Sequence, residues 1–352
     1  MSKVLLFSDI HIHPHKKSTS RLQDCLDVIP WVFDVAKKNN IKSILFGGDF
    51  FHDRHKIDIF TYQKTFETLN QQMNSGDFEL YMLLGNHDLW FMDDTSISSV
   101  FPLSLIKGVK IIDKPCRIEI ENSIWDFLPF TLNPLEALAT IKSEHKREYL
   151  LGHIAINDAK MHRGHYSSDI IVEHEGELIN VDANVFSKYK YVFLGHFHSE
   201  QRVGKNIEYI GSPLQLSFGE SFEDKHLIIF DVENNKKEYV KNEFSPKHII
   251  CNENNISEYN LDGNFVQVLI QDVSNTDIID IKKDIFSNNN VLDLKIKQKI
   301  NKPIHEEDKV VFTSLNEIDM ISKYVDASKT ELDKEYLKKI GEKICKDSKE
   351  NV

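Results

Sequence analysis

Five short segments of this sequence end in side chains that bind metal ions, and each follows an apolar run. They are Asp9-Ile10-His11, Gly48-Asp49, Gly85-Asn86-His87-Asp88, Gly152-His153 and Gly195-His196-Phe197-His198. Their carboxylate, amide and imidazole groups combine hard oxygen with borderline nitrogen donors, which suits a pair of divalent transition metals. Two such cations can activate a water molecule and neutralise charge on a phosphoryl group during an in-line displacement. The segments therefore predict a two-metal site for phosphoester hydrolysis.

Each segment has an ordinary structural explanation when it is taken alone. Asp9 and His11 could form a surface pair, and Asp49 could cap the N-terminus of a helix. Asn86 and its neighbours could form a polar turn, and a single buried histidine is usually a hydrogen-bonded core residue. The occurrence of all five segments in one chain favours the metal site. Most of the 16 histidines also lie at or before residue 198, and neutral imidazole is the commonest transition-metal ligand.

Short apolar runs predict the buried strands that carry these segments. The runs cover residues 4–7, 43–46, 80–84, 149–151 and 191–194. Helical spacing predicts helices over residues 22–36, with Pro30 as a kink or boundary, and over 58–74 and 133–146. Alternating strands and helices imply a layered α/β core. Ligands in such cores gather beyond the carboxyl ends of the strands, where the metal-binding segments stand.

The composition changes after the last of these segments. Residues 231–262 are rich in Asn, Lys and Glu, which places a domain boundary near residue 245. A smaller α/β unit and a C-terminal helical region are expected to follow. Their elements are strands over 265–273 and 291–300, a helix over 277–287 between them, and helices over 314–325 and 331–346. The predicted organisation is a catalytic domain over residues 1–244, a cap domain over 245–312 and C-terminal helices over 313–352.

The overall composition narrows the class of protein. The chain has 352 residues, of which 41% are hydrophobic and 28% charged, as in soluble globular proteins. No apolar run is long enough to span a membrane, and the first residues do not form a signal peptide. The four cysteines are far apart, which indicates reduced thiols in a cytoplasmic protein.

The net charge bears on the substrate. A formal charge of −12 argues against strong unaided binding of nucleic acid, because such binding depends on neutralisation of phosphates by Lys and Arg. It leaves open a nucleic-acid enzyme whose metals, local basic patches or partner supply the positive charge.

The ordered set of five segments resembles the calcineurin-like metallophosphoesterase superfamily. Within it, the sequence is most similar to the SbcD-type DNA-repair nucleases and their bacteriophage recombination-endonuclease relatives. His52 stands where protein phosphatases of the superfamily typically have Asp, and residues 209–220 resemble the stretch that follows the last metal histidines in SbcD-type proteins. The resemblance covers most of the first 240 residues and only the layout of the remainder. It implies a four-layer core of two sheets flanked by helices, with a smaller α/β cap domain and C-terminal helices.

The resemblance also implies a role for each residue of the motifs. One metal would be held by Asp9, His11, Asp49 and His198, and the other by Asp49, Asn86, His153 and His196, with Asp49 as the bridge. His87 would act as leaving-group acid or charge stabiliser and would be oriented by Asp88, while His52 would position the phosphate. The family suggests manganese as the metal, and mixed Asp, Asn and His ligation suits manganese, iron or zinc better than calcium.

Some histidines and lysines lie outside this pattern. We interpret His13 and His15 as surface or substrate-side residues, and His162 and His165 as part of a solvated loop that could touch DNA. Lys295, Lys297 and Lys299 alternate with apolar residues, so a strand would present them on one face. They could form a track for DNA phosphates, or guard an edge strand against aggregation.

The resulting expectation is a manganese-dependent DNA exo- or endonuclease that acts on DNA ends or hairpins. The resemblance implies a homodimer bound through C-terminal helices to an SbcC-type coiled-coil ATPase, in the host-cell cytoplasm if the chain is phage-encoded. Two other classes stay open: a metallophosphoesterase for a small nucleotide diester or phosphoprotein, and a non-catalytic scaffold that binds DNA ends.

Overall fold

The computed structural model describes residues 2–14, 18–141, 147–157, 159, 173–174, 177–178, 181–271, 275–299, 322, 325–326 and 333–350. The chain forms two compact units. The first comprises Met1–Ile270 with Ser274–Lys297, and the second comprises Gln271–Val273 with Gln298–Val352. The first unit therefore extends beyond residue 245, as far as Lys297.

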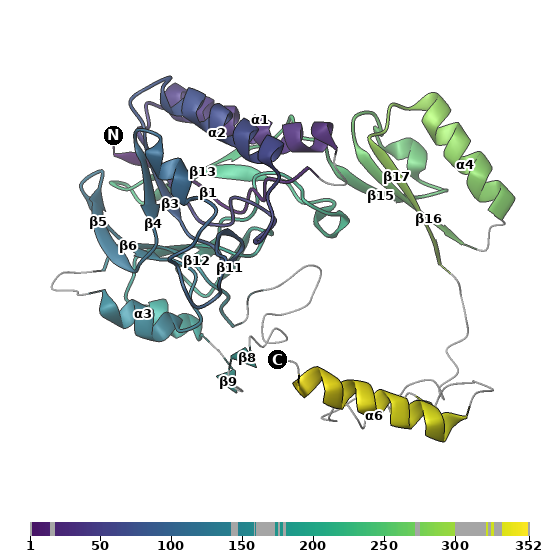
Figure 1. The fold of residues 1–352 in the computed structure, drawn as a ribbon. Helices are drawn as coiled ribbons and strands as arrows, with labels where there is room; N and C mark the ends of the chain where they lie inside the picture. Colours follow the sequence, from purple (N-terminus) through teal and green to yellow (C-terminus); the bar gives the residue numbers. More distant parts are fainter. Residues whose placement is uncertain are drawn as a thin grey trace. The chain divides into compact units, whose positions relative to one another are not determined.

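Two six-stranded mixed sheets form the core of the first unit (Figure 1). The first sheet has the order β14 (Lys236–Lys241), β13 (His226–Asp231), β1 (Lys3–Phe7), β2 (Ser43–Phe46), β3 (Glu79–Leu83), β4 (Val109–Ile112). The second has the order β11 (Gln201–Val203), β12 (Ile207–Tyr209), β10 (Tyr191–Gly195), β7 (Tyr149–His153), β6 (Ser123–Leu128), β5 (Cys116–Ile120). Strands β1 to β4 run parallel, as do β12, β10, β7 and β6, so their carboxyl ends share one edge in each sheet.

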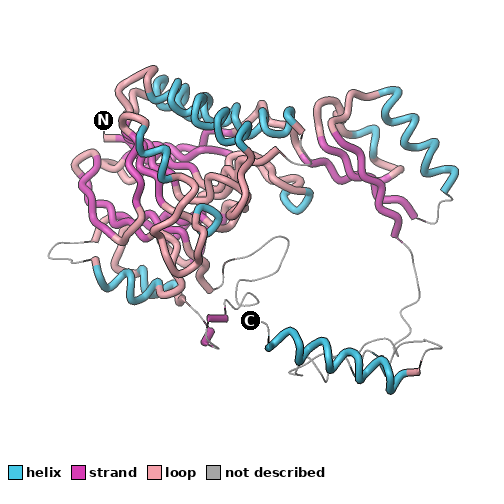
Figure 2. The backbone as a smooth tube through the Cα atoms, in the orientation of Figure 1, coloured by secondary structure: helices cyan, strands magenta, loops and turns pink. Residues whose placement is uncertain are grey.

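Alternating side chains of the strands build three apolar layers. Val4 and Leu6 of β1 belong to the cluster that also contains Trp125 and Phe127 of β6, so the two sheets pack face to face. Leu5 points to the opposite side and joins the cluster with helices α1 (Thr19–Lys38) and α2 (Ile59–Met73). A third cluster packs helix α3 (Pro134–Thr140) against the outer face of the second sheet. Figure 2 shows these helices in cyan along the magenta sheets.

The predicted α/β class and the five strands that carry the motifs are confirmed. Helix α1 passes through Pro30 without ending, so this proline is no boundary. The helix predicted over residues 133–146 ends at Thr140, because Ile141 adopts extended backbone with φ −73° and ψ 98°. Residues 142–146 lie outside the described part of the chain.

A smaller three-stranded sheet follows the core. It has the order β15 (His248–Asn252), β16 (Phe265–Gln271), β17 (Asp293–Lys299), and helix α4 (Asn275–Asn288) connects β16 to β17. These two strands and α4 match the elements predicted over residues 265–300. Short elements complete the first unit: β8 (Glu173–His174), β9 (Glu177–Leu178) and 3₁₀ turns over Asn86–Asp88, Phe101–Leu105, Ala183–Phe186, Phe218–Glu220 and Ile256–Glu258.

The second unit contains helix α6 (Lys334–Glu350), which matches the prediction over residues 331–346. Asp333 accepts hydrogen bonds from the backbone N–H groups of Glu335 and Tyr336 and so caps its N-terminus. Most of the helix predicted over residues 314–325 lies outside the described residues. In the part of the chain that the structure describes, no helix is both long and apolar enough to cross a membrane.

Candidate metal centre

The five predicted segments follow β1, β2, β3, β7 and β10 at the carboxyl ends of the parallel strands. The backbone there is unusual, since Asp9, His11, Asp49 and His196 have φ values of 54°, 46°, 60° and 98°. Non-glycine residues seldom adopt this left-handed region, and such strain gathers at functional sites. Glycine is required at Gly85, because a Cβ there would lie 2.2 Å from Asp49 Oδ1.

Seven donor side chains from these segments converge on one place. Asp9, His11 and His198 form one group of ligand atoms within 4.8 Å of one another, and Asp49, His153 and His196 form a second. The amide oxygen of Asn86 joins the second group, at 3.1 Å from His153 Nε2 and 3.0 Å from His196 Nδ1. Asp49 Oδ2 lies between the groups, at 3.5 Å from His11 Nε2 and 3.4 Å from His153 Nε2. The structure thus brings together all seven residues expected to be ligands.

The donor chemistry of His153 shows that a cation fits this site. Its Nδ1 lies 2.7 Å from the carbonyl oxygen of Gly47, which can only accept, so Nδ1 carries a proton. In the neutral ring Nε2 then presents a lone pair to the oxygens of Asn86 and Asp49. Such a cluster of acceptors needs either a second proton on His153 or a bound cation. Burial opposes the extra proton, but the charge and hydrogen bond of Asp49, the charge of Asp9 and the carbonyl oxygen of Gly47 together raise the pKa of His153 to about 9.

The other ligands are held in states that can bind metal. Burial lowers the pKa of His196 to about 3 and also lowers that of His11, so both rings are neutral and offer a lone pair. Burial opposes ionisation of Asp49, but the charge of His153 lowers the pKa of Asp49 well below its usual value. Asp49, which was predicted to bridge the two metals, is therefore an ionised carboxylate.

Asp88 connects two of the loops that carry predicted ligands. Its buried carboxylate accepts hydrogen bonds from the backbone N–H groups of Gly85, Asp49 and Phe50, each at 2.9 Å. It thereby ties the loop after β3 to the loop after β2. Burial and the nearby charge of Asp49 raise its pKa to about 7.

The ring of His87 is oriented by His52. His87 Nδ1 donates to the carbonyl oxygen of His52 at 2.5 Å, and the two rings stack with centroids 5.7 Å apart. The backbone N–H of His87 also donates to Asp49 Oδ1 at 2.8 Å. His11, His52 and His87 satisfy the same ligand distances as the two groups above, which makes them a third possible ligand group.

Four further histidines were singled out in the sequence analysis, and the structure describes one of them. His13 pairs with Asp53 at 2.9 Å, and its ring lies 5.0 Å from that of His52, so it stands beside the site without joining a ligand group. His15, His162 and His165 lie outside the described residues.

Two buried charged residues beside the predicted ligands had no role in the sequence-based prediction. Glu220 and Lys225 are buried next to His198, and Glu220 Oε1 lies 3.4 Å from His198 Nδ1. The only signal in the sequence was the stretch before residue 220, which was used as a mark of family resemblance.

The lysines proposed for DNA lie on β17, the edge strand of the small sheet. Lys295 and Lys297 are exposed, and Lys295 Nζ lies 5.1 Å from the ring centre of Phe218. The side chain of Lys299 lies outside the described part of the structure.

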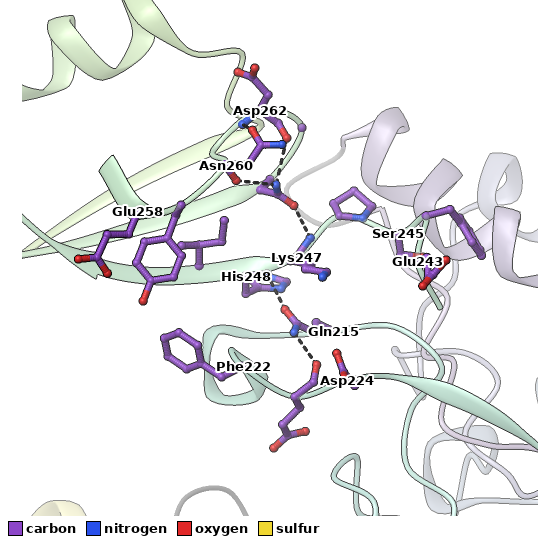
Figure 3. Close-up of a pocket in the computed structure, with 17 residues that line it drawn as sticks. Gln215, Phe222, Asp224, Glu243, Ser245, Lys247, His248, Glu258, Asn260 and Asp262 are labelled. Carbon is purple, nitrogen blue, oxygen red and sulfur yellow. Dashed lines mark hydrogen bonds between the residues drawn. The ribbon is translucent and has the colours of Figure 1, made fainter. Parts of the chain in front are cut away.

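A cavity of about 620 Å³ opens where the loop over residues 215–224 meets the start of β15 (Figure 3). Its charged lining is mainly acidic: Glu223, Asp224, Glu243, Glu258 and Asp262, with Lys247. This lining does not suit a phosphate backbone, and it includes none of the seven predicted ligands.

The chain matches a known protein family and is similar to several known proteins. A family model described as calcineurin-like phosphoesterase matches residues 2–200. Exonuclease subunit 1 of Enterobacteria phage T4 is 26% identical over 225 residues, which are 62% of this chain and 61% of the phage protein. The SbcD component of nuclease SbcCD from Staphylococcus epidermidis is 25% identical over 258 residues, 66% of this chain and 67% of that protein. Among solved structures, a dimetal phosphatase from Danio rerio has a TM-score of 0.41 and 10% identity, covering 68% of this chain and 98% of that one. The match to the phage protein spans less than two thirds of that protein's length.

Proposed function

The chain belongs to the calcineurin-like phosphoesterase family, and on that premise we propose that it is a metal-dependent nuclease that hydrolyses phosphodiester bonds in DNA. The observation that carries the proposal is the convergence of seven metal-donor side chains, with His87 and His52 beside them. The distant relatives, one named as part of an exonuclease and one as part of a nuclease, support DNA over a small ester as the substrate.

The proposed ligand sets share Asp49. Asp9, His11 and His198 would hold one cation with it, and Asn86, His153 and His196 would hold the other. Two divalent cations bound there would supply a nucleophile from water at neutral pH and neutralise charge on the phosphate. The protein's part is to fix the donors in advance: Asp88 locks two of the loops, and Asp9 accepts the backbone N–H of His196 at 3.0 Å. We propose manganese as the metal, since the donor set mixes oxygen with imidazole nitrogen.

His87 would protonate the leaving group or stabilise its charge. Because its Nδ1–H is donated to the carbonyl oxygen of His52, its Nε2 is the nitrogen left for the substrate. In the cationic ring Nε2 can give a proton to the departing oxygen, or stabilise its negative charge. His52 would then contact the phosphate from beside His87.

The remaining proposals concern the domains, the DNA contacts and the partners of the chain. The core domain over residues 1–244 would hold the catalytic site, a cap over 245–312 would contact DNA through Lys295, Lys297 and Lys299, and the helical region over 313–352 would bind a coiled-coil ATPase of the SbcC type. The staphylococcal relative is named as one component of a larger nuclease, which supports a partner protein. We also propose that the protein acts as a homodimer in the cytoplasm.

The experiment that tests the function uses the full chain with Mn²⁺ on linear duplex DNA, on hairpin DNA and on a small chromogenic phosphodiester. We expect degradation of DNA that stops when a chelator removes the metal and returns when Mn²⁺ is added back. Rapid turnover of the small ester with intact DNA would reject the nuclease in favour of a small-substrate phosphoesterase. Binding of DNA ends without hydrolysis under any of these conditions would identify a scaffold.

The lysines of β17 give a separate prediction. Replacing Lys295 and Lys297 together with alanine is expected to weaken binding of duplex DNA, because each lost phosphate contact removes about 0.9 from the slope of log K against log salt concentration. The slope, measured by fluorescence anisotropy in Mg²⁺-free and Mn²⁺-free buffer, should fall by about 2. The matched control is Lys282→Ala with Lys283→Ala on α4, which removes the same charge from exposed positions of the same region. Equal slopes for both double variants would mean that the β17 lysines only protect an edge strand.

A further inference from the structure

His198 differs from the other predicted ligands in the partner of its second ring nitrogen. His153 donates Nδ1–H to a backbone carbonyl oxygen, whereas His198 Nδ1 faces the carboxylate of Glu220 at 3.4 Å. The opposite nitrogen, His198 Nε2, lies 3.0 Å from His11 Nε2 inside the first ligand group. The ring of His198 therefore lies between the first ligand group and the carboxylate of Glu220, which belongs to neither ligand group.

Glu220 is a fully buried acid with its own set of donors. Its Oε2 accepts from Ser212 Oγ at 3.1 Å and from the backbone N–H of Leu216 at 3.2 Å, and it pairs with Lys225 Nζ at 2.8 Å. A buried charge is costly unless it is paired and hydrogen-bonded, and these contacts meet that requirement. The other oxygen, Oε1, faces His198 Nδ1 at 3.4 Å and also accepts from Ser217 Oγ at 3.4 Å.

Lys225 connects the same two residues from the other side. Its Nζ donates to the backbone carbonyl oxygen of His198 at 2.8 Å and pairs with Glu220 and Glu223. Ser212 also donates its backbone N–H to that carbonyl oxygen at 3.0 Å. Main chain and ring of His198 are thus held by one buried network.

The segment that carries Glu220 is anchored at several points. Gly211 has φ +76°, and a Cβ there would lie 2.9 Å from the carbonyl oxygen of His198, so only glycine lets the segment pass this close. Further along, the side chain of Gln215 accepts from the backbone N–H of His248 at 2.6 Å and donates to the carbonyl oxygen of Glu223 at 2.9 Å (Figure 3). These anchors fix the position of the carboxylate independently of any ligand.

We propose that Glu220 is a positioning residue for the metal centre, which holds Nδ1–H of His198 and so presents Nε2 to the metal shared with Asp9 and His11. A carboxylate in this position fixes the tautomer and orientation of a ligand histidine and increases its basicity. The inference rests on the proposed function, since it assigns a role within the proposed metal centre. Glu220 acts on only one of the two ligand groups, because the second group contains no partner of Glu220 among its described contacts.

The test is site-resolved Mn²⁺ binding to Glu220→Gln, measured by calorimetric titration and by electron paramagnetic resonance of the coupled metal pair. We expect one of the two metals to bind about 10–100-fold more weakly, the range for loss of an outer partner of a ligand histidine. The other metal should keep its affinity, and the signal of the coupled pair should give way to that of a single ion. The matched control is Glu223→Gln, which also removes a carboxylate from Lys225 but leaves His198 and Glu220 in contact.

Four further results decide between the proposal and its alternatives. Glu220→Asp, which keeps the charge but shortens the side chain, should weaken the same metal, and it replaces Glu220→Gln if that variant does not fold. Equal weakening of both metals together with a lower melting temperature of the metal-free protein would overturn the proposal, because it would reveal a purely structural role. Unchanged binding in both Glu220 variants would overturn it as well. Failure of the wild-type chain to bind two Mn²⁺ ions would instead reject the proposed metal centre itself.

Discussion

Replacement of His87 by alanine is expected to reduce Mn²⁺-dependent DNA hydrolysis by roughly 10²–10⁴-fold, the contribution typical of a positioned acid or base. The ring of His87 is held by the carbonyl oxygen of His52 and by stacking on the His52 ring, so it is placed before the substrate arrives. Its backbone N–H, which binds Asp49, is retained in the alanine variant. Single-turnover cleavage rates and metal content of the same preparation would measure the effect.

The metal content separates two roles for His87. If His87 serves the leaving group, the variant keeps two Mn²⁺ ions per chain while cleavage falls. If His87 is a ligand in the third group with His11 and His52, the variant loses metal and activity together. The control is His55→Ala, because His55 is an exposed histidine whose Nε2 contacts the carbonyl oxygen of Trp90. We expect its cleavage rate to stay within about threefold of the wild type, as for surface substitutions with small effects.

The core strands could be predicted from the sequence because each is a continuous apolar run that ends in a polar turn. Residues 43–46 and 191–194 are buried on both faces, as their sequences indicate. Strand β5 could not be predicted in the same way, since Arg117 and Glu119 interrupt its apolar pattern at partly exposed positions. Its place is set by pairing with β6, which depends on tertiary structure.

The ligand set could be proposed from the sequence because the residue types themselves carry the chemistry. The ligand residues lie close together because the strands that carry them are parallel, so that their carboxyl ends share one edge in each of the two sheets. The supporting residues could not be assigned in the same way. Glu220 lies 22 positions after His198, and only the packed loop brings the two together.

Asp88 shows the limit of reasoning from neighbours in the sequence. The family resemblance implies that Asp88 orients His87, but nothing in the sequence indicates what else its carboxylate binds. The carboxylate accepts hydrogen bonds from three backbone N–H groups, two of them from the loop that starts at Asp49. Buried backbone N–H groups need hydrogen-bond acceptors, and the Asp88 carboxylate accepts from three of them.

Replacement of Asp49 by asparagine is expected to weaken binding of both metals by more than about 100-fold, beyond the loss seen for an outer-shell partner. Asp49 Oδ2 lies within 3.5 Å of a ring nitrogen of one histidine in each group, His11 and His153. An amide has no charge to share between two cations, so hydrolysis should fall with the metal content. Calorimetric titration with Mn²⁺, beside cleavage assays at a fixed metal concentration, would measure both losses.

The same substitution should change the metal-free protein in a way that can be measured separately. Burial lowers the pKa of His153, and the charge and hydrogen bond of Asp49 make the largest contribution against it, towards the folded pKa of about 9. In Asp49→Asn this contribution is lost, so the pKa of His153 should fall. Because the folded pKa exceeds the usual value, the stabilisation from this pair is complete below about pH 6.5 and is lost as the pH rises through about 9. The melting temperature of the metal-free wild type should fall over this pH range because the Asp49–His153 pair is lost, and the variant should lack that fall.

Asp53→Asn is the matched control, since its half-exposed carboxylate pairs with His13 outside both ligand groups. Full metal binding by Asp49→Asn would contradict a bridging role, and an unchanged pH dependence would contradict the Asp49–His153 pair.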